Sequence, residues 1–333
     1  MKKNSFYFVV IILVSLTSLG YIFRTERLHL LQNEAVKVLN TDSSEVYNND
    51  LNVDENVVSV FLPPVVTFCN EEVPLHLQSV KESMDYELVV NTYRHSRTLL
   101  ILKKLNRWRT EIDTILKQEG VPLDLFYVAV AESELNNNAR SHVGAMGMWQ
   151  FMERTGKEYG MINNRYIDQR RDPVVATRAA CKYFKRAYNR FGNWTLAAAS
   201  YNMGMTGVSN RIKKQGVNSY YDLYLNRETA RYVYRILAFK QILENPEQYG
   251  FNLAEDQLYE PFHYREIVLD SSVNDLIDYA KSHNTNYKEL RRLNPWLNNS
   301  RDFKLVLKKG QELKIKIPIE VSLEKEKELA VLK

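Results

Sequence analysis

The stretch Leu123-Asp-Leu-Phe-Tyr-Val-Ala-Val-Ala131, followed at once by Glu132-Ser133, decides the fold of this chain. Such an apolar run predicts a buried helix, and this one ends on a carboxylate. A glycine-rich loop comes next, Ser141-His-Val-Gly-Ala-Met-Gly-Met-Trp-Gln-Phe-Met152. Burial raises the pKa of a carboxyl group, so a carboxyl placed here can hold a proton near neutral pH. Glu132 is therefore a candidate general acid that protonates a leaving oxygen.

Helical patterns extend on both sides of this stretch, from about residue 75 to 250. Upstream, the aliphatic and charged segment 85–109 and the segment 111–119 each favour a helix. Downstream, Asp172-Pro173 has the residue types that begin a helix. The Ala-rich segment 194–203 and the periodic segment 228–243 predict two more helices. Because strand-like runs are nearly absent, we expect residues 71–250 to form an all-α domain.

A smaller unit of different character follows, at residues 263–318. Residues 263–269 alternate enough to form a strand, and Ser271 can cap a helix that runs to Ser282. Residues 287–293 predict a second short helix, and residues 313–317 a closing strand. This β-α-α-β order in a small unit is more typical of a binding module than of a catalytic domain.

The N-terminus has the features of an export segment. Lys2 and Lys3 precede an uncharged apolar stretch, so residues 1–23 are expected to be a signal peptide or a retained membrane anchor. The polar residues 24–70 then predict a linker. With either fate of the first segment, the rest of the chain is expected outside the cytoplasm, in the periplasm or cell envelope.

Composition excludes several functional classes. A net charge of +5 over 333 residues, without a basic stripe that alternates with aromatic residues, does not indicate a nucleic-acid partner. The six His are scattered, and Cys69 and Cys181 lack metal-ligand spacing, so we expect neither a metal nor another cofactor. The two cysteines could pair in an exported protein, or Cys181 could be a core thiol. An anionic cell-envelope polymer is the partner that suits an exported, mildly basic chain.

Three further polar clusters follow Glu132-Ser133 along the chain. They are Gly147-Met-Trp-Gln150, Ser200-Tyr-Asn-Met-Gly204 and Glu228-Thr-Ala-Arg-Tyr-Val233. Amide and tyrosine side chains both donate and accept hydrogen bonds, which suits the hydroxyl and N-acetyl groups of a sugar. Taken singly, each cluster has a structural alternative: Glu132 could be a solvated helix end, Gln150 and Asn202 could be caps, and the glycines could end helices.

In this order and spacing, the four clusters resemble those of the transglycosylase domain in lytic murein transglycosylases. The resemblance covers about residues 75 to 250, is greatest to the membrane-bound D group, and implies a lysozyme-like all-helical catalytic domain. The family's Glu-Ser pair matches Glu132-Ser133, its Ala-Tyr-Asn-Ala-Gly motif resembles 200–204, and its Glu-Thr-x-x-Tyr-Val motif is similar to 228–233. Departures from the family pattern are Ser200, Met203 and Trp149.

The resemblance implies cleavage of the β-1,4 bond between N-acetylmuramic acid and N-acetylglucosamine in peptidoglycan glycan strands. The product would carry a 1,6-anhydro-muramyl end, and Glu132 alone would serve as acid and then as base, with no cofactor. It also implies a set of substrate-binding residues along the cleft. These are Ser133, Met148, Gln150, Tyr201, Asn202, Glu228 and Tyr232.

Two other functions are open at this point. A hydrolase of the same fold would use water and commonly needs a second carboxylate, for which Asp168 and Asp172 are candidates. Glu134 would point to a different helix face from Glu132. A non-catalytic glycan-binding or scaffold protein is the alternative from another class.

The C-terminal unit resembles a divergent LysM module, a fold that binds glycans containing N-acetylglucosamine. The similarity rests on 264–269, 273–277, 287–290, 293–295 and 309–311. The usual Gly-Asp-Thr-Leu turn is replaced by Asp270-Ser-Ser-Val273. Glycan binding and simple packing on the catalytic domain are therefore both open for this unit.

Overall fold

A computed structural model describes residues 58–298 and 302–319. The expected export segment 1–23 and residues 24–57 of the expected linker lie outside the described residues. Within the described ranges, no helix combines the length and the apolar character that crossing a bilayer requires.

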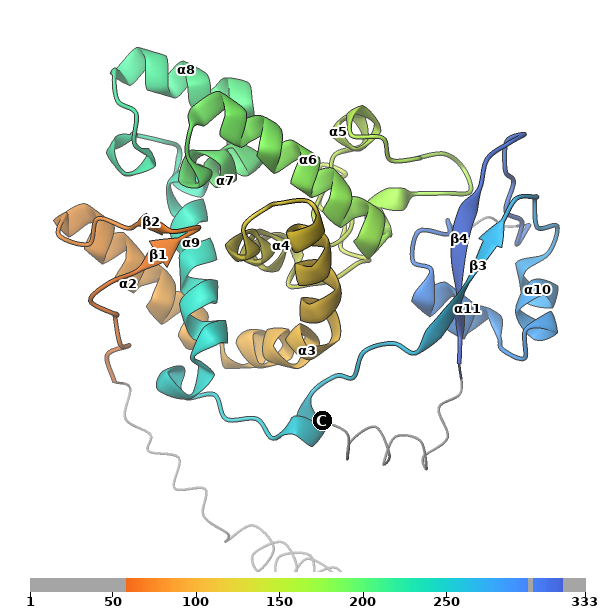
Figure 1. Ribbon diagram of the computed structural model, residues 1–333. Coiled ribbons are helices and arrows are strands. Elements are labelled where there is room, and N and C mark those ends of the chain that lie inside the picture. The colour runs from red at the N-terminus through yellow and green to blue at the C-terminus, as the bar shows by residue number, and fades with distance from the viewer. Residues whose placement is uncertain (1–57, 299–301, 320–333) are drawn as a thin grey trace, which may run out of the picture. The chain divides into compact units, whose positions relative to one another are not determined.

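The described chain is mainly helical, as the sequence predicts (Figure 1). It opens with a short antiparallel hairpin, β1 (Thr67–Phe68) and β2 (Glu71–Glu72). The helices that follow are α2 (Gln78–Thr92), α3 (His95–Gln118), α4 (Phe126–Ser133), α5 (Glu153–Glu158), α6 (Pro173–Phe191), α7 (Trp194–Met203), α8 (Met205–Gln215) and α9 (Arg227–Glu244). Short 3-10 turns are η1 (Leu123–Leu125), η2 (Gln169–Arg171), η3 (Tyr220–Asp222), η4 (Pro246–Tyr249) and η5 (Glu255–Gln257).

The sequence signals locate some helix ends well and others poorly. Asp172 caps α6 as expected, because its Oδ1 accepts from the backbone N–H groups of Val174 and Val175 at 2.9 and 3.1 Å. The expected boundary near residue 110 is wrong, since α3 runs through it and the break falls at Tyr93 and Arg94. Neither Gly nor Pro marks that break. A side-chain hydrogen bond across the break stabilises it instead, as Thr98 Oγ1 donates to the carbonyl of Asn91 at 2.6 Å.

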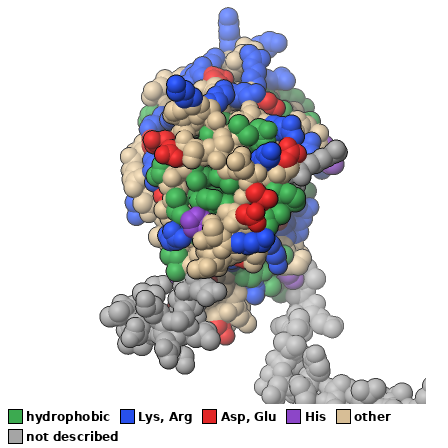
Figure 2. All heavy atoms as spheres, turned by 90° about the vertical axis from the view of Figure 1, so that its right-hand side faces the viewer, with side chains coloured by type: hydrophobic (Ala, Val, Ile, Leu, Met, Phe, Trp, Pro, Cys, Tyr) green, Lys and Arg blue, Asp and Glu red, His purple; other side chains and the backbone are tan. Residues whose placement is uncertain are grey.

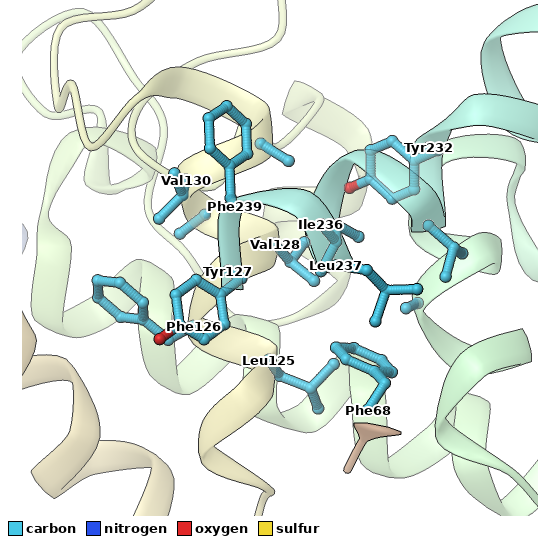
Figure 3. Packing of buried hydrophobic residues seen from close by; sticks show 14 of the residues in the cluster. Phe68, Leu125, Phe126, Tyr127, Val128, Val130, Tyr232, Ile236, Leu237 and Phe239 are labelled. Atoms are coloured by element: carbon cyan, nitrogen blue, oxygen red, sulfur yellow. The ribbon is translucent and has the colours of Figure 1, made fainter. Parts of the chain in front are cut away.

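Helix α4 forms the centre of the helical core (Figure 3). Its residues from Phe126 to Ala131 are buried, and α9 packs against them through Ile236 and Phe239. The hairpin also contributes, since Val66 and Phe68, which the sequence analysis assigned to the linker, are buried in the same core. Each large side chain buried in this way stabilises the fold by about 1.5–3 kcal/mol. Helix α4 is therefore enclosed by other segments as far as Ala131.

The C-terminal unit has the expected β-α-α-β order. It consists of β3 (Tyr264–Leu269), α10 (Leu276–Ser282), α11 (Tyr287–Leu293) and β4 (Leu313–Pro318). The two strands pair antiparallel, with Ile267 opposite Ile315. The expected cap at Ser271 is wrong, because α10 begins five residues later. Asp275 caps it, and its Oδ1 accepts from the N–H groups of Ile277 and Asp278.

One loop of the helical domain packs into this C-terminal unit. Ile167 is buried in the unit's own hydrophobic cluster and pairs with Leu297 in an isolated β-bridge. The neighbouring N–H of Asp168 donates to the carbonyl of Trp296 at 2.8 Å. The loop that ends at η2 is therefore fixed to the C-terminal unit by a buried side chain and by backbone hydrogen bonds.

Truncation of Phe239 tests the central position of α4. Phe239→Ala leaves a cavity against α4, so we expect the free energy of unfolding to fall by about 3–5 kcal/mol. Tyr224→Ala is the matched control, because Tyr224 is 84% exposed and its truncation should change stability little. Urea denaturation followed by circular dichroism measures both variants. A loss at Phe239 no larger than that at Tyr224 would contradict the packing described.

Candidate active site

Glu132 lies in the last turn of α4, at the edge of the core. The backbone turns sharply just after it, since Glu134 and Leu135 both adopt positive φ, at 55° and 59°. Glu134 ends the helix in the left-handed conformation, which non-glycine residues adopt at some cost. The carboxyl of Glu132 is thus carried by a buried helix and lies where the chain leaves that helix.

The carboxyl of Glu132 has one direct side-chain partner. Tyr232 of α9 donates its hydroxyl to Oε1 of Glu132 at 2.5 Å, and Tyr232 itself is only 2% exposed. Burial raises the pKa of Glu132 to about 7. The hydrogen bond from Tyr232 and the positive charge of Arg235 oppose this shift, while the negative charge of Glu228 adds to it. The carboxyl therefore exchanges its proton close to neutral pH.

Arg235 links this carboxyl to two others. Its guanidinium pairs with Glu228 at 3.1 Å and lies 3.8 Å from the carboxylate of Glu87, whose side chain is 1% exposed. Glu87 also accepts from Arg231 Nε at 2.6 Å. Sequence reasoning missed Arg235. The available signal was its spacing, because it lies three residues after Tyr232 and seven after Glu228 on one helix.

Four hydrogen bonds hold residues 147–150, and one of them comes from the end of α4. Ser133 Oγ donates to the carbonyl of Met148 at 2.7 Å, and the Tyr201 hydroxyl donates to the carbonyl of Trp149 at 2.8 Å. Gln150 has a positive φ of 49°, and its Nε2 donates to the carbonyls of Gly147 and Ala139 at 2.8 and 3.2 Å. Ser133, Gln150 and Tyr201 therefore fix the backbone of this segment relative to Glu132.

Gly147 and Arg170 hold the same segment from behind. A Cβ at Gly147 would lie 1.9 Å from the carbonyl oxygen of Arg170, and φ at Gly147 is +78°, so only glycine fits. Arg170 Nη1 donates to the carbonyls of Gly144 and Phe151 at 3.0 and 3.2 Å. Its charge is balanced by buried Asp168, with Nη2 to Oδ2 at 2.8 Å. This pair supports the loop rather than reacting.

The remaining expected site residues separate into two groups. Asn202 and Glu228 are exposed, and Asn202 Oδ1 accepts from Thr229 Oγ1 at 2.7 Å. Met148 is only 1% exposed, so its side chain packs in the core and its carbonyl, not its thioether, faces Ser133. Tyr232 contacts Glu132 from within the core. Met148 and Tyr232 are thus poorly placed to touch a ligand directly.

The other carboxylates near Glu132 in sequence have structural partners. Glu134 pairs with Arg97 at 2.6 Å, Asp168 with Arg170, and Asp172 caps α6. Over the ranges that the structure describes, no group of three His, Cys, Asp or Glu side chains could hold a metal ion. Cys69 and Cys181 are both buried free thiols, and burial raises the pKa of Cys181 to about 12.

Family models match two parts of this chain. The family model described as "Transglycosylase SLT domain" matches residues 111–223, which include Glu132, the loop 147–150 and Tyr201. The chain carries a transglycosylase SLT domain. Outside it, the model described as "Soluble lytic transglycosylase C-terminal LysM-like domain" matches residues 265–321. The expected helical transglycosylase domain and the expected LysM-like module are both confirmed.

Relatives of this SLT domain include membrane-bound lytic murein transglycosylase D of Escherichia coli K12. The two are 35% identical over 143 residues, which are 41% of this chain and 32% of the relative, so the match spans about a third of that protein. Among solved structures, an inactive mutant of lytic transglycosylase Slt from Pseudomonas aeruginosa shares 23% identity over 46% of this chain and 26% of its own, with a TM-score of 0.34. The 70 kDa soluble lytic transglycosylase of Escherichia coli shares 16% identity over 59% of this chain and 34% of its own length, with a TM-score of 0.37.

Substitution of Gly147 tests how the SLT domain holds its loop. Gly147→Ala forces a methyl group into the carbonyl of Arg170, so we expect the free energy of unfolding to fall by more than about 2 kcal/mol. Gly144→Ala is the matched control, because φ at Gly144 is also positive but no atom lies within 4 Å of the added Cβ. Thermal unfolding compares the two. Equal losses would show that backbone strain alone, not the contact with Arg170, requires glycine at residue 147.

Proposed function

We propose that this protein is a peptidoglycan lytic transglycosylase that cleaves the β-1,4 bond between N-acetylmuramic acid and N-acetylglucosamine and leaves a 1,6-anhydro-muramyl end. The observation that carries the proposal is the carboxyl of Glu132, which is largely buried, bonded to Tyr232 and has a pKa of about 7. The SLT family match and the relationship to a murein transglycosylase support the choice of substrate.

The first half of the reaction requires a proton on Glu132. At a pKa of about 7, roughly half of the molecules hold that proton at neutral pH. Protonated Glu132 donates to the glycosidic oxygen as the bond to C1 of the muramyl residue breaks. The substrate's own N-acetyl group stabilises the positive charge that develops at C1.

The second half of the reaction uses the same carboxyl as a base. Glu132, now a carboxylate, takes the proton from the C6 hydroxyl of the muramyl residue while that oxygen attacks C1. The proton given in the first step is thereby recovered, and no water is consumed. Since Glu134, Asp168 and Asp172 are each engaged in structural contacts, a mechanism with one carboxyl fits the described residues better than the two-carboxylate scheme.

The other residues around Glu132 are proposed to have different roles, some in contact with the glycan and some in support of Glu132. Gln150, Tyr201, Asn202 and Glu228 are proposed to contact the glycan, together with the backbone that Ser133 orders. Tyr232 is proposed to orient Glu132 and keep its pKa from rising further. Met148 is proposed to act only through its carbonyl, because its side chain is in the core.

We also propose how the chain is organised and where it acts. Residues 71–250 would be the catalytic domain and 263–318 a module that binds the glycan strand or positions it. The chain would act outside the cytoplasm, in the periplasm or cell envelope, attached to the membrane if the segment 1–23 is retained. Hydrolysis by the same fold is the rival reaction, and it would leave reducing ends.

Substitution of Glu132 tests the proposed reaction. Because general acid–base catalysis contributes about 100-fold or more, Glu132→Gln should lose at least that much cleavage of purified peptidoglycan sacculi. Mass spectrometry of the muropeptides should show anhydro-muramyl ends with the wild type. Glu134→Gln, two residues away, should release the same products at close to the wild-type rate. Reducing ends from the wild type would favour hydrolysis, and undiminished cleavage by Glu132→Gln would refute the catalytic role.

The pH dependence of cleavage tests the environment of Glu132. Since the protonated form starts the reaction, the rate should fall as pH rises through about 7. The hydroxyl of Tyr232 stabilises the charged carboxylate and so lowers its pKa. Tyr232→Phe should therefore raise the pKa and move the alkaline limb to higher pH, whatever it does to the maximal rate. An unmoved limb, or one moved to lower pH, would contradict this assignment.

A further inference from the structure

Glu87 of α2 is a buried carboxylate that donates and accepts no proton in the reaction proposed for Glu132. Its side chain is only 1% exposed, and it faces α9. Arg231 Nε donates to its Oε1 at 2.6 Å, and Asn91 Nδ2 donates to its Oε2 at 3.2 Å. A carboxylate is costly to bury unless it is paired and hydrogen-bonded, so these contacts fix where its negative charge lies.

Arg235 is a second cation beside Glu87, one helical turn after Arg231 on α9. Its Nε lies 3.8 Å from Oε2 of Glu87, and its Nη1 donates to Oε1 of Glu228 at 3.1 Å. The side chain of Glu228 is 61% exposed, so water and salt screen that pair, whereas the charge of buried Glu87 is screened much less. Glu87 therefore contributes strongly to holding Arg235, although its distance is longer.

The guanidinium of Arg235 is withdrawn from water. Lys and Arg side chains on one face of the molecule extend into solvent (Figure 2). The side chain of Arg235, by contrast, is only 19% exposed. A charge that water screens poorly acts strongly on its neighbours, so the position of Arg235 matters to each carboxyl near it.

Glu132 is one of the carboxyls on which Arg235 acts. Tyr232, which donates to Glu132, precedes Arg235 by three residues, so the two side chains lie on the same face of α9. Burial raises the pKa of Glu132, while the hydrogen bond from Tyr232 and then the charge of Arg235 oppose that rise. Glu228 adds to the rise. An arginine paired directly with Glu132 would lower its pKa by about 1–3 and so remove its proton at neutral pH.

Other titratable groups face these carboxyls from the neighbouring elements. Tyr201 of α7 faces Glu132, since burial and then the charge of Glu132 raise its pKa. Burial also raises the pKa of Tyr220 on η3, with a small contribution from the charge of Glu87. On α3, Arg97 pairs with Glu134 instead. Within the described ranges, Arg235 is therefore the cation whose movement would reach the catalytic carboxyl.

We propose that Glu87 is a positioning residue for the reaction at Glu132, because it holds the guanidinium of Arg235 beside α2 and so keeps that cation from pairing with the catalytic carboxyl. The reaction itself rests on the proposed function. Held in this place, Arg235 leaves Glu132 able to carry the proton that starts cleavage. It is still near enough to stabilise the carboxylate that forms once the proton has been given.

The pKa of Glu132 in charge variants tests the proposal. Glu87→Gln releases Arg235, so the pKa of Glu132, followed by NMR of its carboxyl carbon, should fall by about 1 or more. At pH 7 the protonated fraction would then drop from about a half to about a tenth, so cleavage should slow about fivefold and its alkaline limb should move to lower pH. Arg231→Gln is the matched control, because it removes a cation from the same carboxylate but leaves Glu87 to hold Arg235. The pKa of Glu132 and the rate should stay at their wild-type values there.

A second substitution distinguishes movement of Arg235 from simple loss of the charge of Glu87. Arg235→Gln alone should raise the pKa of Glu132, because a positive charge is removed. In Glu87→Gln/Arg235→Gln the pKa should match that of Arg235→Gln, since no guanidinium is left to move. Melting curves establish that each variant is folded. If Glu87→Gln alone does not fold, Arg235→Gln still decides, because an unmoved pKa there would show that Arg235 does not act on Glu132.

Three results would overturn the proposal. They are a pKa of Glu132 that does not fall in Glu87→Gln, an equal fall when Glu87→Gln is added to Arg235→Gln, and an equal fall in Arg231→Gln. The NMR measurements need no substrate, so they separate this inference from the proposed function. The expected shifts in a protein that forms no anhydro ends would remove only the proposed function, and anhydro ends without those shifts would remove only this inference.

Discussion

Burial of one carboxyl at the end of a buried helix is the constraint on which the rest of this structure depends. Helix α4 can hold Glu132 at the edge of the core only because its preceding six residues are packed on all sides. Desolvation at that position costs free energy for the charged form, and this cost is what raises the pKa to about 7. The hydrogen bond from Tyr232 limits the shift, so the carboxyl is neither permanently charged nor permanently neutral.

The surroundings of Glu132 are fixed by parts of the chain that do no chemistry. Arg170 joins the loop 144–151 to η2 through two hydrogen bonds. Ile167, just before η2, packs into the C-terminal unit. On the other side, Arg235 connects the charges of Glu228 and Glu87 beneath Tyr232. The SLT domain and the LysM-like module are therefore in contact through the loop that ends at η2.

Local sequence signals predicted the helical class, the β-α-α-β unit and the helix 194–203, because caps, proline, glycine and periodicity act over a few residues. They did not predict the break at Tyr93, which a contact with Thr98 stabilises, or the hairpin that buries Phe68. Contacts between distant segments were not predicted either, because local signals do not specify which segments meet in the fold. Tyr232 and Glu132 are 100 residues apart, so the sequence could suggest that both belong to the site but not that one bonds the other.

Everything proposed for Glu132 requires that its carboxyl have a pKa near 7 in the folded protein. The most direct measurement is a pH titration by NMR of the side-chain carboxyl carbons in the isotopically labelled full chain, with Glu132→Gln used to assign the signal. We expect one glutamate signal to titrate near pH 7 and to vanish in Glu132→Gln. A Glu132 signal that titrates near 4.5, the ordinary value for glutamate, would contradict it.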